Sequence, residues 1–250
     1  MISVCIATHN AEEYILEQLN SILTQIGDND EIIISDDGSS DRTVEIIKKI
    51  NDCRIHLYAY KHLEDYSTEH LPSYYYATAN FYNALLKAKG NVIFLSDQDD
   101  IWTTNKVVTT LRYLNNYDIV CSNFSIIDKD GNLIDKIYWQ GDLFEHLNWI
   151  KVWKYLPFRG CCLAFKKEVL QNALPFPKRL FLHDCWIGLN AWFSGYKYKF
   201  INEPLLLYRR HGNNVSFMDS PNTLIFKLGY RLRLFFQILT NKFFKYKKQI

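Results

Sequence analysis

The sequence lacks the short motifs that mark three large groups of proteins. It contains no Gly-x-Gly-x-x-Gly pattern, no phosphate loop ending in Gly-Lys-Ser or Gly-Lys-Thr, and no Gly-x-Ser-x-Gly elbow. These motifs bind dinucleotides, bind nucleoside triphosphates and carry a hydrolase nucleophile, respectively. Dinucleotide-binding, P-loop and hydrolase interpretations therefore lack their motifs.

The cysteines lack the spacing of a zinc or redox site. No two of the six form a Cys-x-x-Cys pair or stand at the Cys/His spacings that structural zinc requires. We therefore expect buried, reduced thiols at Cys5, Cys53, Cys121, Cys161, Cys162 and Cys185.

Long apolar runs are absent as well. Residues 1–7 lack the basic region and the extended apolar region of a signal peptide, which predicts a cytoplasmic protein. No stretch of about 18 apolar residues exists, because Lys227, Arg231 and Arg233 interrupt the one candidate. We expect no membrane-spanning helix.

Acidic residues are missing from the last 30 positions. Residues 221–250 hold seven lysines and arginines, so the first 220 residues carry a net charge of −5 within a chain of +2. Because the basic residues gather in this tail and do not line a groove, nucleic-acid binding is not expected.

The tail is also amphipathic. Its apolar side chains recur at helical spacing with Lys227, Arg231 and Lys242 off that stripe, which predicts a basic amphipathic helix. Such a helix lies on an anionic membrane, on its own domain or on a second subunit, and the missing acids favour the membrane. The stripe consists of Ile225, Leu228, Leu232, Phe235, Phe236, Leu239 and Phe243.

What the sequence does contain is an alternation of apolar strands and helices. Strands are predicted at residues 2–7, 31–35, 54–60 and 91–95, with helical periodicity after each of the first two and a helix near 80–89. This alternation is typical of an α/β fold with a mostly parallel sheet and helices on both faces. Ligands of such sheets bind beyond the carboxyl ends of the strands.

From residue 118 the pattern predicts mixed strands. Strands are expected at 119–126, 160–165, 198–201 and 205–208, and a helix from His183 to Gly195. We predict one domain at 1–220 with two halves, residues 1–117 and residues 118–220. A helical tail occupies 221–250.

The densest polar cluster, Ser96-Asp97-Gln98-Asp99-Asp100, ends the fourth strand. Its carboxylates would repel one another without a cation, and hard oxygen ligands suit Mg²⁺ or Mn²⁺. A solvated acidic turn that caps the next helix is the alternative. The position directly after a buried strand favours a metal site.

The second strand ends in Asp36-Asp37-Gly38-Ser39-Ser40-Asp41. A carboxylate here can accept the imide N–H of uracil or thymine, and Ser40 or Asp41 can cap the following helix. The loop after the first strand, Thr8-His9-Asn10 with Glu12 nearby, offers backbone groups to a nucleoside.

Two later segments are candidates for catalysis and phosphate binding. In His183-Asp184-Cys185-Trp186 the aspartate starts a helix, where spacing alone favours a capping role over that of a base. Arg209, Arg210 and His211 follow a strand, where they can bind diphosphate or complete a metal shell, or simply form a basic surface loop.

In this order, these segments resemble the family 2 glycosyltransferases, which have the GT-A fold. The resemblance extends to about residue 216 and rests on ISVCIATHNAEEYI, IIISDDGSSDRT, NFYNALLKAKGNVIFLSDQDDIW, HDCW and YRRHGNNVS. The last segments are most similar to the bacterial rhamnosyltransferase-like branch, which builds O-antigen, capsule and related glycans.

The resemblance implies a role for each matched position. Asp184 would be the catalytic base, which reverses the capping interpretation, and the reaction would be a single displacement with inversion. Asp97, Asp99 and His211 would bind Mn²⁺ or Mg²⁺. The nucleotide would contact Thr8, His9, Asn10, Glu12, Asp36, Asp37, Ser39, Asp97, Gln98 and Arg210.

The resulting hypothesis is an inverting glycosyltransferase at the inner face of the plasma membrane. The resemblance implies a UDP- or dTDP-sugar donor bound by the half at 1–117 and a lipid-linked glycan acceptor bound by the half at 118–220. A sugar-phosphate nucleotidyltransferase would need a Gly-rich, basic loop after the first strand. The segment at that position, Thr8-His9-Asn10-Ala11, is not such a loop. A non-catalytic glycan-binding protein would not need Asp37, Asp97, Asp99 and Asp184 together.

Overall fold

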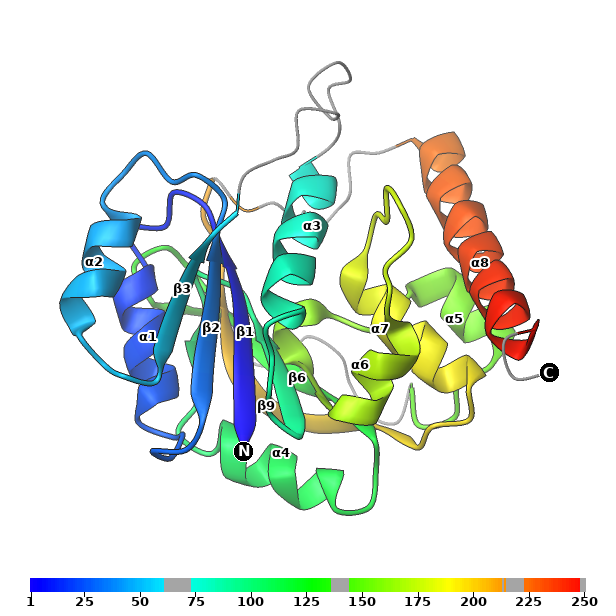
Figure 1. The fold of residues 1–250 in the computed structure, drawn as a ribbon, viewed down its shortest axis with the longest axis horizontal. Coiled ribbons are helices and arrows are strands. Elements are labelled where there is room, and N and C mark those ends of the chain that lie inside the picture. The colour runs from blue at the N-terminus through cyan, green and yellow to red at the C-terminus, as the bar shows by residue number, and fades with distance from the viewer. Residues whose placement is uncertain (61–72, 136–143, 213, 215–222, 248–250) are drawn as a thin grey trace.

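The structure, a computed structural model, describes residues 1–60, 73–135, 144–212, 214 and 223–247. A central sheet crosses the molecule, with α1 (Ile15–Leu23) and α2 (Thr43–Ile50) on one side and α3 (Ser73–Leu85) on the other (Figure 1). The predicted α/β class is confirmed.

The first half of the sheet is parallel. Its strands are β1 (Ile2–Thr8), β2 (Glu31–Asp36), β3 (Ile55–Ala59) and β4 (Val92–Ser96), in the spatial order β3-β2-β1-β4. Every residue of β2 is buried, as expected for a strand covered by helices on both faces. The loops after β1, β2 and β4 consequently meet at one edge.

The sheet continues through strands of mixed direction, in the order β4-β8-β6-β9-β5 with β7 paired to β6. These are β5 (Ile101–Trp102), β6 (Ile119–Ile127), β7 (Leu133–Asp135), β8 (Leu163–Lys166) and β9 (Tyr198–Arg209). β8 runs antiparallel to both β4 and β6, whereas β9 is parallel to β6. The prediction of mixed strands after residue 118 is confirmed.

Helices α4 (Lys106–Leu114), α5 (Trp149–Tyr155), α6 (Lys167–Ala173), α7 (His183–Phe193) and α8 (Leu224–Lys247) complete the fold, with a short 3₁₀ turn, η2 (Gly160–Cys162). α7 is fixed from both sides. Trp186 is fully buried and its Nε1–H donates to Ala173 O at 2.8 Å. On the other side, a Cβ at Gly188 would lie 2.1 Å from Phe158 Cγ, so only glycine fits this approach.

Three local predictions differ from the structure. α3 begins at Ser73 rather than near residue 80, and the two strands predicted at 198–201 and 205–208 are the single strand β9. β9 stays continuous because register shifts opposite Asn123 accommodate Pro204, which has no N–H for the ladder. Cys53, predicted to be buried, is exposed; the other five cysteines are buried and all six are free thiols.

The C-terminal helix α8 is apolar on two faces. Leu234 and Ile238 are buried at the domain, and Asn241 Nδ2 donates to Asn190 Oδ1 of α7 at 3.1 Å. Leu232 and Phe236 of the predicted stripe are instead 55% and 68% exposed. α8 thus packs on its own domain, also through the half-buried Phe235 of the stripe, while the exposed members of the stripe are Ile225, Leu228, Leu232, Phe236 and Leu239. The side chain of Phe243, the last member of the predicted stripe, lies outside the described residues. Among the described helices, none is long and apolar enough to cross a membrane.

Candidate active site

The loops after β1 and β2 are joined through the buried carboxylate of Asp36. Thr8 Oγ1–H donates to Asp36 Oδ1 at 3.0 Å, and the Ser39 N–H donates to Asp36 Oδ2 at the same distance. Ser39 Oγ also bonds Asp36 Oδ1 at 2.5 Å. Asp36 therefore shapes the loops, whereas the half-buried Asp37, whose N–H donates to Thr8 O at 2.8 Å, stands next to it.

A second set of contacts holds the tip of the first loop. Asn10 has a φ of 48°, in the left-handed region that asparagine tolerates, and its Oδ1 accepts the Ser40 N–H at 2.8 Å. The ring Nδ1 of His9 lies 2.7 Å from Asp37 O. Glu12 Oε2 accepts both the backbone N–H and the Nε–H of Arg42 at 3.0 Å.

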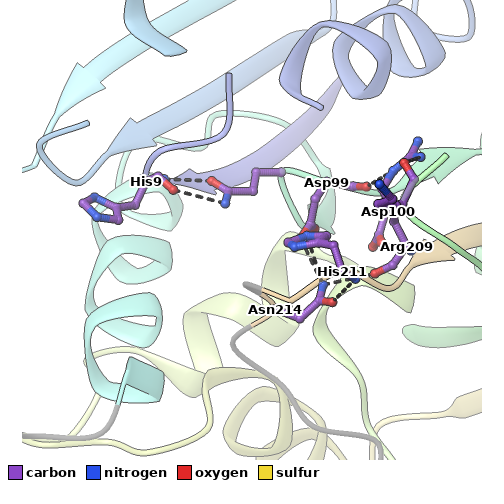
Figure 2. A network of polar contacts seen from close by, with 8 residues as sticks. His9, Asp99, Asp100, Arg209, His211 and Asn214 are labelled. Carbon is purple, nitrogen blue, oxygen red and sulfur yellow. Dashed lines mark hydrogen bonds and ion pairs between the residues drawn. The ribbon is translucent and has the colours of Figure 1, made fainter. Parts of the chain in front are cut away.

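The loop after β4 is tied to the loop after β1 by Gln98. Its Oε1 accepts the His9 N–H at 2.7 Å, and its Nε2 donates to His9 O at 3.2 Å (Figure 2). One amide side chain thus satisfies both backbone groups of a loop residue. The predicted nucleotide-binding segments after β1, β2 and β4 form one connected layer.

Three carboxylates follow β4. Asp97 is half-buried, whereas Asp99 and Asp100 are 9% and 1% exposed. Burial, followed by the negative charges of Asp99 and Asp184, raises the pKa of Asp97 from its ordinary 3.8 to about 8. Burial, followed by the negative charges of Asp99 and Asp97, also raises the pKa of Asp100 well above its usual value. This arrangement favours a bound cation, which would stabilise the ionised forms.

Asp99 is held from the loop after β9. His211 Nε2 lies 2.8 Å from Asp99 Oδ2, and Asn214 Nδ2 donates to the same oxygen at 3.3 Å (Figure 2). The His211 ring also stacks on Tyr14, with ring centres 4.9 Å apart. The predicted metal ligands Asp99 and His211 are therefore brought together from sites 112 residues apart in the sequence.

Arg209 is a functional candidate that the sequence reasoning placed second to Arg210. Its backbone N–H donates to Asp100 Oδ1 and its Nε–H to Asp99 O, both at 3.0 Å (Figure 2). The guanidinium is 3% exposed, pairs with Glu17 and lies over the Tyr14 ring. Arg210, half-buried, donates its N–H to Ile127 O at 2.8 Å and lies 5.9 Å from the Tyr208 ring centre.

Asp184 approaches the same carboxylates from α7. Its Oδ2 accepts the Gly160 N–H at 3.1 Å and its Oδ1 accepts the Cys185 N–H at 2.7 Å. Gly160 is followed by Cys161, whose Sγ lies within 4.8 Å of an Asp97 oxygen, so the turn η2 joins Asp184 to the carboxylates after β4. The charge of Asp184 is also among those that raise the pKa of Asp97. Asp184 is thus oriented by two backbone donors beside the predicted metal-binding loop.

His183, the residue before Asp184, is half-buried. Its ring stacks on Phe81 at 4.2 Å between ring centres, and Nδ1 lies 3.4 Å from Thr78 Oγ1. Burial lowers the pKa of His183, while the charge of Asp184 opposes that shift. A neutral imidazole packed in this way supports the start of α7.

The sequence reasoning also missed polar residues inside α3 and α4. Asn80 Nδ2 donates to Thr8 O at 3.1 Å, and the fully buried Lys106 Nζ donates to Cys161 O at 3.0 Å. Lys106 also lies 5.0 Å from the Trp102 ring centre. Residues such as these look like the polar face of an amphipathic helix, so only the packed structure indicates their positions.

A metal-ligating set is present among the described residues. Oxygen atoms of Asp97 and Asp100 and the Sγ of Cys161 all lie within 4.8 Å of one another. Asp100 Oδ2 is buried without a hydrogen-bond partner among the described residues. The site therefore fits a divalent cation by its donors and by an unsatisfied buried oxygen.

Solved structures share this fold. TarS residues 1–349 of S. aureus, in complex with UDP-GlcNAc, superpose with a TM-score of 0.67 and 18% identity, covering 93% of this chain and 66% of that TarS fragment. A mannosyltransferase of Pyrobaculum calidifontis, in complex with GDP-Man and Mn²⁺, has a TM-score of 0.56 and 19% identity, covering 84% of this chain and 56% of that one. The fold is that of the GT-A glycosyltransferases.

Sequence relatives are bacterial. The dTDP-rhamnosyl transferase RfbG of Shigella flexneri is 31% identical over 228 residues, covering 83% of this chain and 72% of RfbG. WfaP of Escherichia coli, a UDP-Glc:alpha-D-GlcNAc-diphosphoundecaprenol beta-1,3-glucosyltransferase, is 28% identical over 217 residues, covering 86% of this chain and 80% of WfaP.

A glycosyltransferase of Nostoc sp. named as uncharacterized is 28% identical over 228 residues, and the chain spans 66% of that protein's length. The family model for glycosyl transferase family 2 matches residues 3–174, which is more than half of the chain. The protein therefore belongs to glycosyltransferase family 2.

Proposed function

We propose that the protein is an inverting, metal-dependent glycosyltransferase that moves a sugar from a UDP- or dTDP-sugar to a hydroxyl of a lipid-linked glycan. The observation that carries the proposal is the position of Asp184, which accepts the Gly160 and Cys185 N–H groups at the turn where Cys161 Sγ lies within 4.8 Å of an Asp97 oxygen. In this arrangement the base at Asp184 would act on the attacking acceptor hydroxyl, and the cation near Asp97 would act on the leaving diphosphate.

The donor nucleotide is assigned to the connected loops after β1, β2 and β4. Asp37 is the candidate for reading the base, because Asp36 is committed to Thr8 and Ser39. His9, Asn10, Glu12 and Gln98 form the walls through the contacts described above, and Arg210 is proposed for the phosphates. The names of RfbG and WfaP include a dTDP-sugar and a UDP-sugar, respectively, which supports either nucleotide.

Asp184 is assigned the role of general base. Two backbone N–H groups fix its carboxylate, so it is oriented before an acceptor arrives. It would accept the proton of the acceptor hydroxyl while that oxygen forms a bond to the anomeric carbon and the bond to the nucleoside diphosphate breaks. Attack opposite the leaving group inverts the configuration.

Mn²⁺ or Mg²⁺ is proposed as the cofactor, held by Asp97 and Asp99 with His211. When bound, the cation supplies neutralisation of the charge on the leaving diphosphate. Asn214 and His211 fix the Asp99 carboxylate, and Arg209 fixes the backbone of the same loop. These residues preserve the spacing of the carboxylates that the cation requires.

Peripheral contact with the inner face of the plasma membrane is proposed through α5 and α8. Trp149 and Ile150 of α5 are 55% and 78% exposed, and Trp149 lies 5.8 Å from Phe235 of α8 between ring centres. Together with the exposed stripe of α8 they form an apolar surface flanked by basic side chains, which suits anionic lipid. A lipid-linked acceptor would be reached from this surface.

The membrane contact is tested by sedimentation with vesicles of neutral or anionic phospholipid. We expect binding to anionic vesicles that weakens at least tenfold in Leu232→Glu and in Ile150→Glu. Leu16→Glu, at a 47% exposed leucine of α1 on the other side of the molecule, is the matched control. Equal binding by all four proteins would contradict the proposed surface.

The transfer reaction is tested by incubating the protein with Mn²⁺, UDP- and dTDP-sugars and undecaprenyl-diphosphate-linked acceptors, and by measuring release of the nucleoside diphosphate. Analysis of the product by NMR then assigns the anomeric configuration. Product of inverted configuration supports the proposal, and product of retained configuration overturns the assignment of Asp184.

A further inference from the structure

The turn η2 carries a thiol to the carboxylate cluster. Cys161 is 4% exposed, its carbonyl accepts from the buried Lys106 Nζ at 3.0 Å, and the preceding Gly160 N–H is bonded to Asp184. These contacts fix the turn on both sides. The Cys161 Sγ lies within 4.8 Å of an oxygen of Asp97.

The donor atoms gathered here differ from the proposed cation site. One oxygen each of Asp97 and Asp100 and the Cys161 Sγ lie within 4.8 Å of one another. The set shares Asp97 with the proposed Mn²⁺ or Mg²⁺ ligands, but it contains sulfur. Thiolate ligands select thiophilic ions such as Zn²⁺ and Cd²⁺, whereas Mg²⁺ prefers oxygen.

An independent feature of Asp100 points to a ligand. Its side chain is 1% exposed and its Oδ1 accepts the Arg209 N–H, while Oδ2 has no hydrogen-bond partner among the described residues. A buried polar atom without a partner is unfavourable, and buried groups of this kind usually mark an ion, a water or a function. A cation at the cluster would satisfy this oxygen.

The dimensions suit a tetrahedral ion after a small contraction. With Zn–O near 2.0 Å and Zn–S near 2.3 Å, ligand atoms around Zn²⁺ lie roughly 3.3 to 3.8 Å apart. The three donor atoms span at most 4.8 Å, so an approach of about 1 Å completes three positions and leaves a fourth for water. Side-chain rotation supplies movements of this size.

We propose that Asp97, Asp100 and Cys161 form a binding site for a thiophilic divalent cation such as Zn²⁺. Binding forms a zinc–sulfur bond and releases the thiol proton to solvent. Because Asp97 belongs to both donor sets, an ion in this site competes with the Mn²⁺ or Mg²⁺ that accompanies the donor sugar. Only this competition rests on the proposed function; the binding of the thiophilic ion does not.

Co²⁺ is the probe that tests the thiol ligand, because a cobalt–thiolate bond produces a sulfur-to-metal charge-transfer band in the near ultraviolet. All proteins carry Cys53→Ser, which removes the exposed thiol. In this background we expect the band to saturate at a single equivalent of Co²⁺ and to disappear when Zn²⁺ is added. Cys161→Ser abolishes the band.

Cys162→Ser is the matched control, because its Sγ lies 3.9 Å from that of Cys161 in the same turn but outside the donor set. It should keep the band. Asp100→Asn keeps both thiols and should weaken Zn²⁺ binding at least tenfold by calorimetry, so the proposal remains testable if Cys161→Ser does not fold. Circular dichroism and thermal melting of each variant identify any loss of folding.

Binding of Co²⁺ without the band, or a band that survives in folded Cys161→Ser, would overturn the proposal. Unchanged Zn²⁺ affinity in Asp100→Asn would do the same. The competition is measured separately, as a rise in the apparent Kd of UDP with Mn²⁺ when Zn²⁺ is present. If UDP with Mn²⁺ does not bind at all, the proposed function fails while the cobalt result still decides the thiophilic site.

Discussion

Replacing Asp184 with asparagine removes the proposed base while changing few atoms. Because the carboxylate accepts one N–H at each oxygen, an amide can keep only one of these bonds and turns its NH₂ group toward the other N–H. Loss of one such bond costs about 1 kcal/mol, which lowers the Tm of a chain of this size by roughly 2 to 4 °C. The variant therefore folds.

The effect on transfer is expected to be far larger than the effect on stability. Removal of a positioned general base typically lowers the rate by about 10² to 10⁴-fold, or roughly 2.7 to 5.4 kcal/mol of transition-state free energy. We expect kcat to fall by this factor and the affinity for UDP with Mn²⁺ to stay within about threefold. Single-turnover transfer and calorimetry measure the two quantities.

Asp118→Asn is the matched control. Asp118 also accepts a backbone N–H, from Lys197 at 2.9 Å, but it precedes β6 and lies at the edge of the sheet opposite to the loops after β1 and β4. Its replacement should reduce stability without changing kcat. Asp184→Asn with full transfer activity would refute the assignment of the base.

Three further predictions concern stability and the cation site. Gly188→Ala places a Cβ 2.1 Å from Phe158 Cγ, so overpacking of about 1 to 3 kcal/mol should lower the Tm, whereas Gly229→Ala, with open space around it, should not. Equal Tm values for the two variants would contradict the packing. Without metal, the free energy of unfolding should fall as pH rises from about 4 to about 8. Burial raises the pKa of Asp97 from 3.8 to about 8, so the folded protein keeps this proton over a pH range in which the unfolded chain has already lost it. Urea unfolding with EDTA measures this slope, which Mn²⁺ and Asp97→Asn should each reduce; the raised pKa of Asp100 contributes the remainder. Stability that rises over this range is the contrary result. Arg209→Met should weaken UDP binding with Mn²⁺ at least tenfold by calorimetry, because the buried guanidinium holds the Asp99 backbone. The control Arg112→Met, at an arginine of α4, should leave this binding unchanged. Equal binding by the two variants would show that the loop does not depend on Arg209.

The first half of the fold could be predicted from the sequence because its strands are continuous apolar runs. Residues 32–34 and 92–95 are apolar and precede polar turns, and a strand covered on both faces requires this pattern. Because these strands are parallel, the polar loops that follow them meet at one edge of the sheet. In the structure they are joined by Gln98 and Asp36.

The remaining features depend on packing that no local pattern records. Arg209 and Arg210 are adjacent and chemically identical, and only the packing at the end of β9 turns the first toward Asp99 and Asp100. Cys161 looked like an ordinary buried thiol because its neighbours, Asp97 and Asp100, lie more than sixty positions earlier in the chain. α8 is apolar on two faces, so its periodicity did not distinguish the packed face from the exposed one.

Calorimetric titration of UDP and dTDP, with and without Mn²⁺, measures whether the loops after β1, β2 and β4 bind a donor nucleotide. We expect metal-dependent binding of at least one nucleotide to the wild-type protein and loss of that binding in Asp99→Ala, because Asp99 links the β4 loop to His211. If folded wild-type protein binds neither nucleotide in the presence of Mn²⁺, the claim that these loops form a donor-sugar site is contradicted.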